Sequence, residues 1–238
     1  MDKVAILSLF RDNEGVYIDD YLARIKSLAY KEIMVYLVEG DSKDNTLAQL
    51  DSIANASANK KRFRVVKHDT GRPKYGSVVN LDRFLALGET ANAALERIVR
   101  DSWADRVLVI DSDLLYPPNI IERLLSTKKD IVAPIIIAGE IFYDIWGFRR
   151  LGGSHFSSNK GDITENKPFE IYSAGGIVMF PFTAIKQGAR YTDEAIVSLC
   201  RECAKLGYSI WCDPSVSVYH PLPSAPNDYN YHLSKFGA

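Results

Sequence analysis

The sequence predicts an α/β fold with a mostly parallel central sheet and helices on both faces. Short apolar runs of strand length alternate along the chain with segments whose apolar residues recur at helical spacing. This alternation is typical of chains in which helices connect parallel strands. With 238 residues, of which 47% are hydrophobic, the chain can bury a substantial core, and no linker is evident. We therefore expect one α/β domain.

The first half of the chain contains three predicted strands. Residues 4–10 form an apolar run interrupted only by Ser8, and residues 16–29 carry apolar side chains at helical spacing. A second apolar run, 33–38, leads into the polar loop 39–46. The remaining elements expected in this half are a helix over 47–56, a strand over 63–66 and a helix over 81–99 with a weak point at Gly88.

The second half begins with a strand over 107–110 that ends at two acids. A short helix over 120–125 and a buried strand over 131–137 follow. Residues 138–167 are irregular, with aromatic residues among glycines, as is typical of a binding loop or lid. The last expected elements are an apolar run up to residue 180, a helix over 192–205 capped by Thr192 or Asp193, and strands over 209–212 and 216–219.

Composition excludes some classes of partner and site. The net charge of -1 and the pI near 6.4 give no general attraction to nucleic acid or anionic membranes. Met1 leads directly into the first strand and no apolar stretch is long enough to span a bilayer, so we expect a cytosolic protein. Cys200, Cys203 and Cys212 make an odd count without a second metal-binding pair, which favours structural thiols.

The acids Asp111 and Asp113 are the leading candidates for a cation site. Alternate residues of an extended segment point the same way, so both carboxylates can face one ligand. Ligands of open α/β sheets bind outside the carboxyl ends of the strands, and Mg²⁺ and Mn²⁺ prefer carboxylate oxygens. The alternative is a pair of solvated turn acids, because Pro117 and Pro118 follow closely.

Five segments taken together resemble a GT-A glycosyltransferase, which has a Rossmann-like nucleotide-diphospho-sugar transferase fold. The resemblance covers roughly residues 3 to 221 and is closest to glycosyltransferase family 2 and to the fungal mannosyltransferases of the Anp1 and capsule-associated types. Each motif is degenerate alone, but their order and spacing are more specific. The segments are 8–13, 39–46, 111–113, 173–176 and 205–220.

The resemblance implies transfer of one sugar from a GDP- or UDP-sugar donor to an acceptor hydroxyl, with Mn²⁺ or Mg²⁺. It implies metal ligands at Asp111, Asp113 and His220, for which the alternative is a structural histidine. The metal would offset charge on the departing diphosphate. The residues expected to bind the donor are Ser8, Phe10, Arg11, Asn13, Glu39, Asp41, Asp111 and Ser112.

The catalytic base is where the sequence departs from the family pattern. Asp193 and Glu194 lie two or three residues earlier than the usual acidic pair, and Asp193 can equally be a helix cap. Asp144 is the next candidate, and a retaining enzyme would need no such base. Trp146, with Gly175 and Gly176, is expected to contact the acceptor, although aromatic packing and a tight turn are competing explanations.

Two other functions stay open. A sugar-nucleotide nucleotidyltransferase would need a glycine-rich phosphate loop after the first strand, and residues 9–14 are not such a loop. An inactive nucleotide-sugar-binding module would keep the same fold. The sequence does not identify the acceptor, whether glycan, protein, small molecule or nucleic acid, nor the oligomeric state. We expect a catalytic domain over 1–221 and a tail over 222–238, either a flap over the donor or a disordered end.

Overall fold

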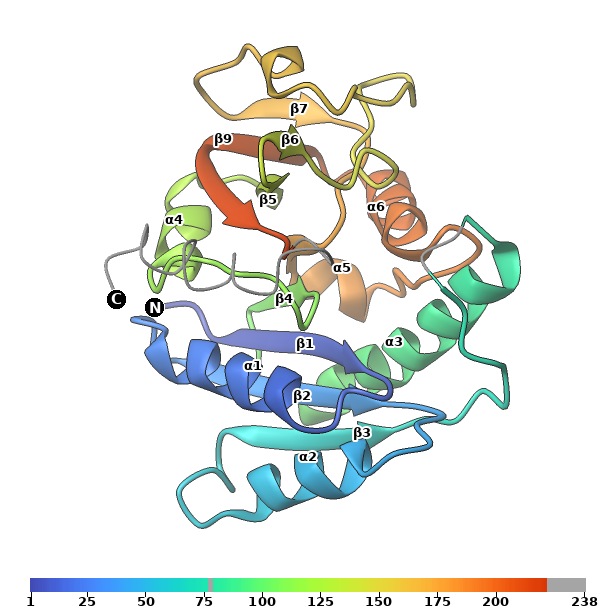
Figure 1. Cartoon of the computed structure of the whole chain (residues 1–238). Coiled ribbons are helices and arrows are strands. Elements are labelled where there is room, and N and C mark those ends of the chain that lie inside the picture. The colour runs from blue at the N-terminus through green and yellow to red at the C-terminus, as the bar shows by residue number, and fades with distance from the viewer. Residues whose placement is uncertain (77–78, 222–238) are drawn as a thin grey trace.

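The structure, a computed structural model, describes residues 1–76 and 79–221. Its centre is a nine-stranded sheet in the order β3-β2-β1-β4-β8-β5-β9-β7, with β6 paired to β5 (Figure 1). The strands are β1 (Val4–Phe10), β2 (Ile33–Glu39), β3 (Phe63–Lys67), β4 (Arg106–Ile110), β5 (Ile131–Ala138), β6 (Ile141–Phe142), β7 (Phe169–Ile171), β8 (Ile177–Pro181) and β9 (Ile210–Tyr219).

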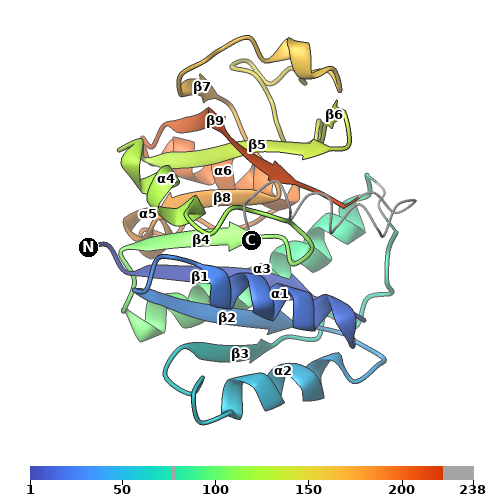
Figure 2. The ribbon, with the colours of Figure 1, turned by 60° about the vertical axis from the view of Figure 1, so that its left-hand side comes forward.

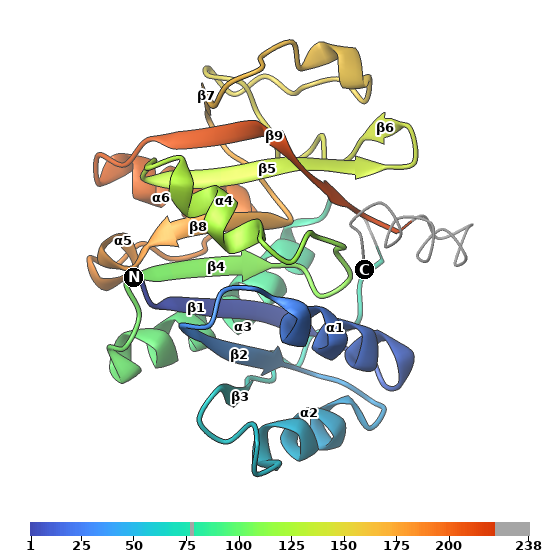
Figure 3. The same cartoon turned by 90° about the vertical axis from the view of Figure 1, so that its left-hand side faces the viewer.

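Helices cover both faces of the sheet, as predicted. Helices α1 and α4 lie on one face, and α3, α5 and α6 lie on the other (Figures 2 and 3). The helices are α1 (Val16–Ser27), α2 (Thr46–Asn55), α3 (Leu81–Asp101), α4 (Ile120–Ser126), α5 (Phe182–Lys186) and α6 (Ala195–Lys205), with a short 3₁₀ turn η1 (Lys160–Asp162). None of the helices within the described ranges has the length and apolar character needed to cross a membrane. A cytosolic location stays a prediction.

The first four strands form a parallel half-sheet. In β1 and β2 nearly every residue is buried, which explains why both read as continuous apolar runs. Strand β1 pairs in parallel with β2 and β4, and β2 pairs in parallel with β3. The carboxyl ends of the four strands therefore meet at one edge of the sheet, where Asp111 follows β4.

Strand β8 runs against its neighbours β4 and β5, a feature that the sequence did not predict. An apolar run carries no sign of its direction, and the reversal depends on Gly176, whose φ is 65°. The Asp111 amide donates to the carbonyl of Gly176 at 2.7 Å. Of the nine strands in the described residues, six still run in one direction, so the prediction of a mostly parallel sheet is confirmed.

Two predicted element boundaries were wrong, at the start of α6 and between the two C-terminal strand segments. Helix α6 begins at Ala195 and not at residue 192, because the Thr192 amide donates to Ser198 Oγ and no side chain caps the helix. Helix α3 is unbroken at Gly88, whose lack of a side chain lets the helix approach Tyr191. The two C-terminal strand segments are one bulged strand, β9. The tail over 222–238 lies outside the described residues.

Candidate active site

A cavity of about 350 Å³ opens at the carboxyl edge of the parallel half-sheet. Leu7 and Leu9 of β1 and Val109 of β4 form its floor, and α3 forms one wall. Its polar groups come from four separate parts of the chain: Arg83, Asp111, Ser112, Asp113, Asp144 and His220. The loop after β4 thus delivers both predicted acids into a space large enough for part of a ligand.

Asp111 and Asp113 have opposite electrostatic environments. The surrounding protein, with the charges of Asp113 and Asp144, raises the pKa of Asp111 to about 8. At Asp113 burial favours a higher pKa, but the hydrogen bond to His220, the charge of His220 and that of Arg24 together outweigh burial and lower the pKa. The side chain of Asp111 is exposed in the cavity, yet the protein compensates its ionised form poorly, and a bound cation would stabilise that ionised form.

His220 is oriented for ligation through Nε2. Its Nδ1 lies 2.8 Å from the carbonyl oxygen of Pro221, which can only accept, so Nδ1 carries the proton. The Nε2 atom lies 3.2 Å from Asp113 Oδ2, and the ring stacks on Tyr143 at 4.0 Å. Burial favours a lower pKa at His220, but the hydrogen bond to Asp113, together with the charges of Asp113 and Asp111 and the contact with Pro221, outweighs burial and raises the pKa.

The predicted metal ligands are close together but do not form a complete cage. Within residues 1–76 and 79–221, no three carboxylate, imidazole or thiol side chains are arranged to hold an ion. Asp113 and His220 pair with each other instead. Their oxygen and nitrogen atoms suit Mn²⁺ or Mg²⁺, which commonly complete their coordination with substrate phosphates. The residues therefore fit a cation that binds together with a phosphorylated ligand.

Asp144 is held in a strained position against the turn before β8. Its φ is 60°, and the Gly147 amide donates to its carboxylate at 3.2 Å. A Cβ on Gly175 would lie 1.8 Å from Asp144 Oδ2, so that glycine makes room for the carboxylate. Burial raises the pKa of Asp144 to about 6, against the opposing effect of the Gly147 hydrogen bond.

Asp193 and Glu194 do not line the cavity. Glu194 pairs with Arg149 at 3.1 Å and with Arg201 at 2.8 Å, and Asp193 also pairs with Arg201. Their neighbours Ala195 and Ile196 reach the cavity wall instead. The geometry therefore favours Asp144 over this pair as an acid that can meet a substrate.

These ion pairs predict different effects of the two amide substitutions. Glu194→Gln should lower the free energy of unfolding by about 1 kcal/mol or more, because it leaves Arg149, whose side chain is 13% exposed, without its carboxylate partner. Asp193→Asn, at a side chain that is 57% exposed, should change stability little. Chemical denaturation of both variants measures the difference. Turnover should survive in both, and loss of turnover with unchanged stability in either would restore that residue as a base.

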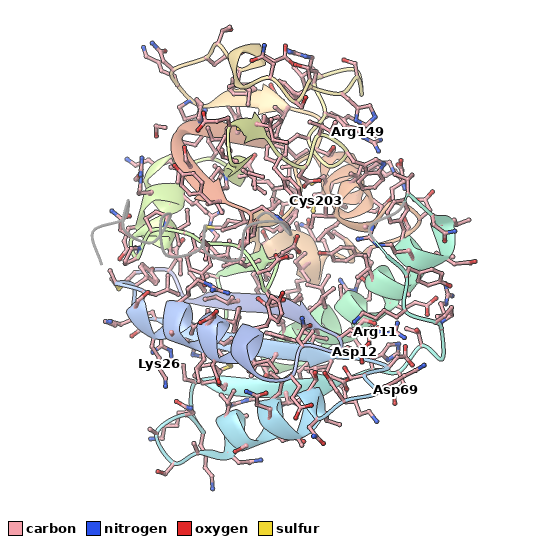
Figure 4. The ribbon with its side chains drawn as sticks, viewed as in Figure 1. Arg11, Asp12, Lys26, Asp69, Arg149 and Cys203 are labelled. Carbon is pink, nitrogen blue, oxygen red and sulfur yellow. The ribbon has the colours of Figure 1, made fainter. Side chains whose placement is uncertain are left out.

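A second cavity, of about 210 Å³, holds four of the predicted donor-binding residues. Phe10, Arg11, Asn13 and Asp41 line it, and it shares Leu9 and Leu87 with the larger cavity. Arg11 lies beside Asp12 at the carboxyl end of β1 (Figure 4).

Hydrogen bonds to main-chain groups hold two of these side chains. Asp41 accepts hydrogen bonds from the amides of Thr70 and Gly71, and Arg11 donates to the carbonyls of Arg72 and Pro73. The two cavities therefore adjoin at the carboxyl edge, and we call the pair of cavities the groove. These bonds hold two side chains of the smaller cavity.

Ser8 and Glu39 lie away from this groove. Ser8 is fully buried on the side of the sheet that α1 covers, since side chains alternate along β1 and Leu7 and Leu9 face the cavity. Glu39 is buried and accepts a hydrogen bond from the Ser42 amide at 2.9 Å. Glu39 therefore supports the loop after β2, and neither side chain lines either cavity.

The sequence analysis missed the contribution of α3. Arg83, Phe84 and Leu87 all line the larger cavity. The Arg83 guanidinium opposes the rise in pKa that burial causes at Asp111 and Asp144. Phe84 stacks on Trp146 at 4.5 Å, so one face of this predicted acceptor platform is already covered. The helical pattern gave no functional signal, because an arginine on a long, charged helix is usually solvated.

A match to a known protein family decides to which class the protein belongs. The family described as Cryptococcal mannosyltransferase 1 matches residues 3–205, most of the chain. The chain belongs to the cryptococcal mannosyltransferase 1 family. This assignment confirms the predicted resemblance to fungal capsule mannosyltransferases and the prediction of a glycosyltransferase.

Solved structures confirm the GT-A fold of this mannosyltransferase family member. Mannosyltransferase PcManGT from Pyrobaculum calidifontis, in complex with GDP-Man and Mn²⁺, aligns with a TM-score of 0.59 at 15% identity, over 94% of this chain and 58% of that one. GalNAc-T7 with UDP, GalNAc and Mn²⁺ gives a TM-score of 0.63 at 13% identity, over 93% and 44%. S. aureus TarS with UDP-GlcNAc gives 0.58 at 16%, over 92% and 58%.

A curated relative supports the same class over a short segment. A Glycosyltransferase 25 family member from Aedes aegypti is 38% identical over 66 residues, which is 27% of this chain and 11% of that protein. The chain thus spans under two thirds of the length of the solved structures and a small part of this relative. These similarities support the fold and the class, while donor and acceptor require separate arguments.

Proposed function

We propose that the protein transfers a single mannose from GDP-mannose to an acceptor hydroxyl, in a reaction that requires Mn²⁺ or Mg²⁺. The observation that carries this proposal is the pair of adjoining cavities, which share Leu9 and Leu87 in their linings. The larger cavity is lined by three carboxylates, a histidine and an arginine. The family assignment supports mannose, and PcManGT was solved with GDP-Man and Mn²⁺. A UDP-sugar is the alternative donor.

We propose a role for each polar group from the cavity that it lines. The nucleoside would occupy the smaller cavity beside Arg11, Asn13 and Asp41, and the sugar would occupy the larger one. Asp113 and His220 would hold the cation, with Asp111 contacting the metal or the ribose. A bound cation would offset the charge that develops on the departing GDP. Arg83 lies in the same cavity, where its guanidinium can donate to diphosphate oxygens.

Asp144 is the base of the proposed reaction. It lies in the cavity wall, where its carboxylate can accept the proton of the acceptor hydroxyl as that oxygen attacks the anomeric carbon. A pKa of about 6 keeps it ionised at neutral pH while leaving it more basic than an ordinary aspartate. This role corresponds to inversion at the anomeric carbon.

Ligand-induced stabilisation tests the proposal directly. GDP-mannose with Mn²⁺ should raise the melting temperature, since a ligand at one hundred times its Kd adds about 2.7 kcal/mol to the free energy of unfolding. Removal of the ion with EDTA should abolish most of the shift. UDP-glucose and UDP-GlcNAc under the same conditions show which nucleobase and which sugar the protein prefers.

Three outcomes would change the assignment. Stabilisation by UDP-sugars and not by GDP-mannose would overturn the proposed donor while keeping the reaction class. Stabilisation by GDP-mannose without hydrolysis or transfer of mannose, across a panel of glycan acceptors, would favour an inactive binding module. Release of pyrophosphate from GTP and mannose 1-phosphate would favour a nucleotidyltransferase.

A further inference from the structure

Arg24 is a buried cation on the opposite side of the sheet from the groove. It lies in α1 and is 6% exposed. Its Nη2 donates to the carbonyl oxygen of Ser112 at 2.7 Å, across 88 positions of sequence. The guanidinium therefore reaches the loop that carries Asp111 and Asp113 from behind.

A group of buried hydroxyls surrounds this guanidinium. The hydroxyls of Tyr116, Tyr21 and Ser8 are buried, and within the described residues none of the three has a hydrogen-bond partner. Tyr116 and Tyr21 belong to the electrostatic environment of Arg24, together with Asp20 and Asp113. Burial raises the pKa of Tyr116 to about 12, so the phenol stays neutral and does not offset the charge. Moving a guanidinium out of water is costly unless hydrogen bonds compensate, and a buried cation of this kind calls for a specific role.

The bond to Ser112 constrains the peptide that precedes Asp113. A peptide unit is planar, so fixing the carbonyl oxygen of Ser112 also fixes the amide nitrogen and the Cα of Asp113. At the other end of the loop, the Asp111 amide donates to Gly176, and the Leu114 amide donates to the carbonyl of Asp111. Neither of these two bonds involves α1, and the hydrogen bond from Arg24 holds the loop from that side.

We propose that Arg24 is a positioning residue that sets the spacing and direction of Asp111 and Asp113 toward the cation and the diphosphate. This inference rests on the proposed role of those two acids. Groups behind metal ligands commonly contribute about 10- to 100-fold to metal affinity. The contribution of Arg24 should appear in the Mn²⁺ dependence of nucleotide binding more than in overall stability.

The test compares two charge removals on one helix. Arg24→Met removes the buried donor, and Lys26→Met removes an exposed charge two positions away, on the outer face of α1 (Figure 4). We expect the Mn²⁺ concentration for half-maximal GDP binding, measured calorimetrically, to rise about tenfold or more in Arg24→Met and to stay at the parent value in Lys26→Met. Arg24→Lys keeps the charge but loses the planar guanidinium, so its half-maximal Mn²⁺ concentration should lie between those of the two methionine variants.

Hydrogen exchange supplies a readout that needs no ligand. Amides of residues 111–115 should exchange several-fold faster in Arg24→Met than in Lys26→Met, while protection in β2 stays unchanged. If Arg24→Met does not fold, the same two measurements on Arg24→Lys decide the question.

The results separate the two hypotheses. Parent-like Mn²⁺ dependence together with parent-like exchange in a folded Arg24 variant would overturn the positioning role. A parent protein that binds neither GDP nor UDP with Mn²⁺ would refute the proposed function, and faster loop exchange in the Arg24 variant would then still support the positioning role.

Discussion

Asp113→Asn should abolish Mn²⁺-dependent binding of the nucleotide donor while leaving the fold intact. The substitution is nearly isosteric, and the side chain is 43% exposed, so packing changes little. It removes the charge that faces His220 Nε2 at 3.2 Å and that would bind the cation. Calorimetric titration of GDP-mannose with and without Mn²⁺ should show a loss of about 100-fold or more in the metal-dependent affinity, of the size expected when a charged partner is removed.

The matched control for this substitution is Asp162→Asn. Asp162 is also a loop aspartate and pairs with Arg150 at 2.7 Å, but it does not line the groove. Donor affinity should be unchanged in that variant, and both proteins should melt within a few degrees of the parent. Equal donor affinity in Asp113→Asn and the parent, with Mn²⁺ present, would refute Asp113 as a metal ligand.

Asp144→Asn should lower turnover by about 100-fold or more and leave donor binding almost unchanged. General-base catalysis typically contributes this much, and an amide cannot accept the proton. In the parent, kcat/KM should fall as the pH drops through about 6, because protonation of Asp144 in the free enzyme removes the base. The acidic limb should vanish from the residual activity of the variant.

Stability gives an independent check on the same carboxylate. The pKa of Asp144 is higher in the folded protein than the ordinary value of 3.8, so the folded state binds the proton more tightly than the unfolded state. The contribution of Asp144 therefore becomes more destabilising as the pH rises from about 4 to 6, and it stays so above pH 6. Asp144→Asn should melt higher than the parent at pH 8, and a lower melting temperature would contradict the raised pKa.

Much of the donor side of the site could be predicted from local sequence patterns. The strand over 107–110 is apolar and buried, and parallel strands end at a common edge, so the placement of Asp111 and Asp113 followed from local sequence and sheet geometry. Arg11 and Asp41 were predicted from the family resemblance, and each follows a strand of the parallel half-sheet. These predictions needed no knowledge of contacts between distant segments.

The rest of the site depends on contacts that no local pattern encodes. Asp144 reaches the cavity through an irregular loop whose path is set by Gly175, which lies 31 positions later. Glu194 was a candidate base from the family resemblance. Its ion pair with Arg149, which is 45 positions away, has no local sequence signal. Arg83 lies on a helix whose amphipathic pattern reports packing and not function.

The position of β8 also sets the order in which the sheet can be completed. Strands β1 to β4 pair among themselves with residues 4–110 only, so this half-sheet can form while later segments are still being synthesised. Strand β5 is made next but pairs with β8 and not with β4, so the apolar edge of β4 stays open until residues 177–181 arrive. An open strand edge is a template for pairing with other chains. A nascent chain that ends before residue 177 therefore carries Asp111 and Asp113 beside an open strand edge, and we expect it to aggregate more readily than the complete sheet.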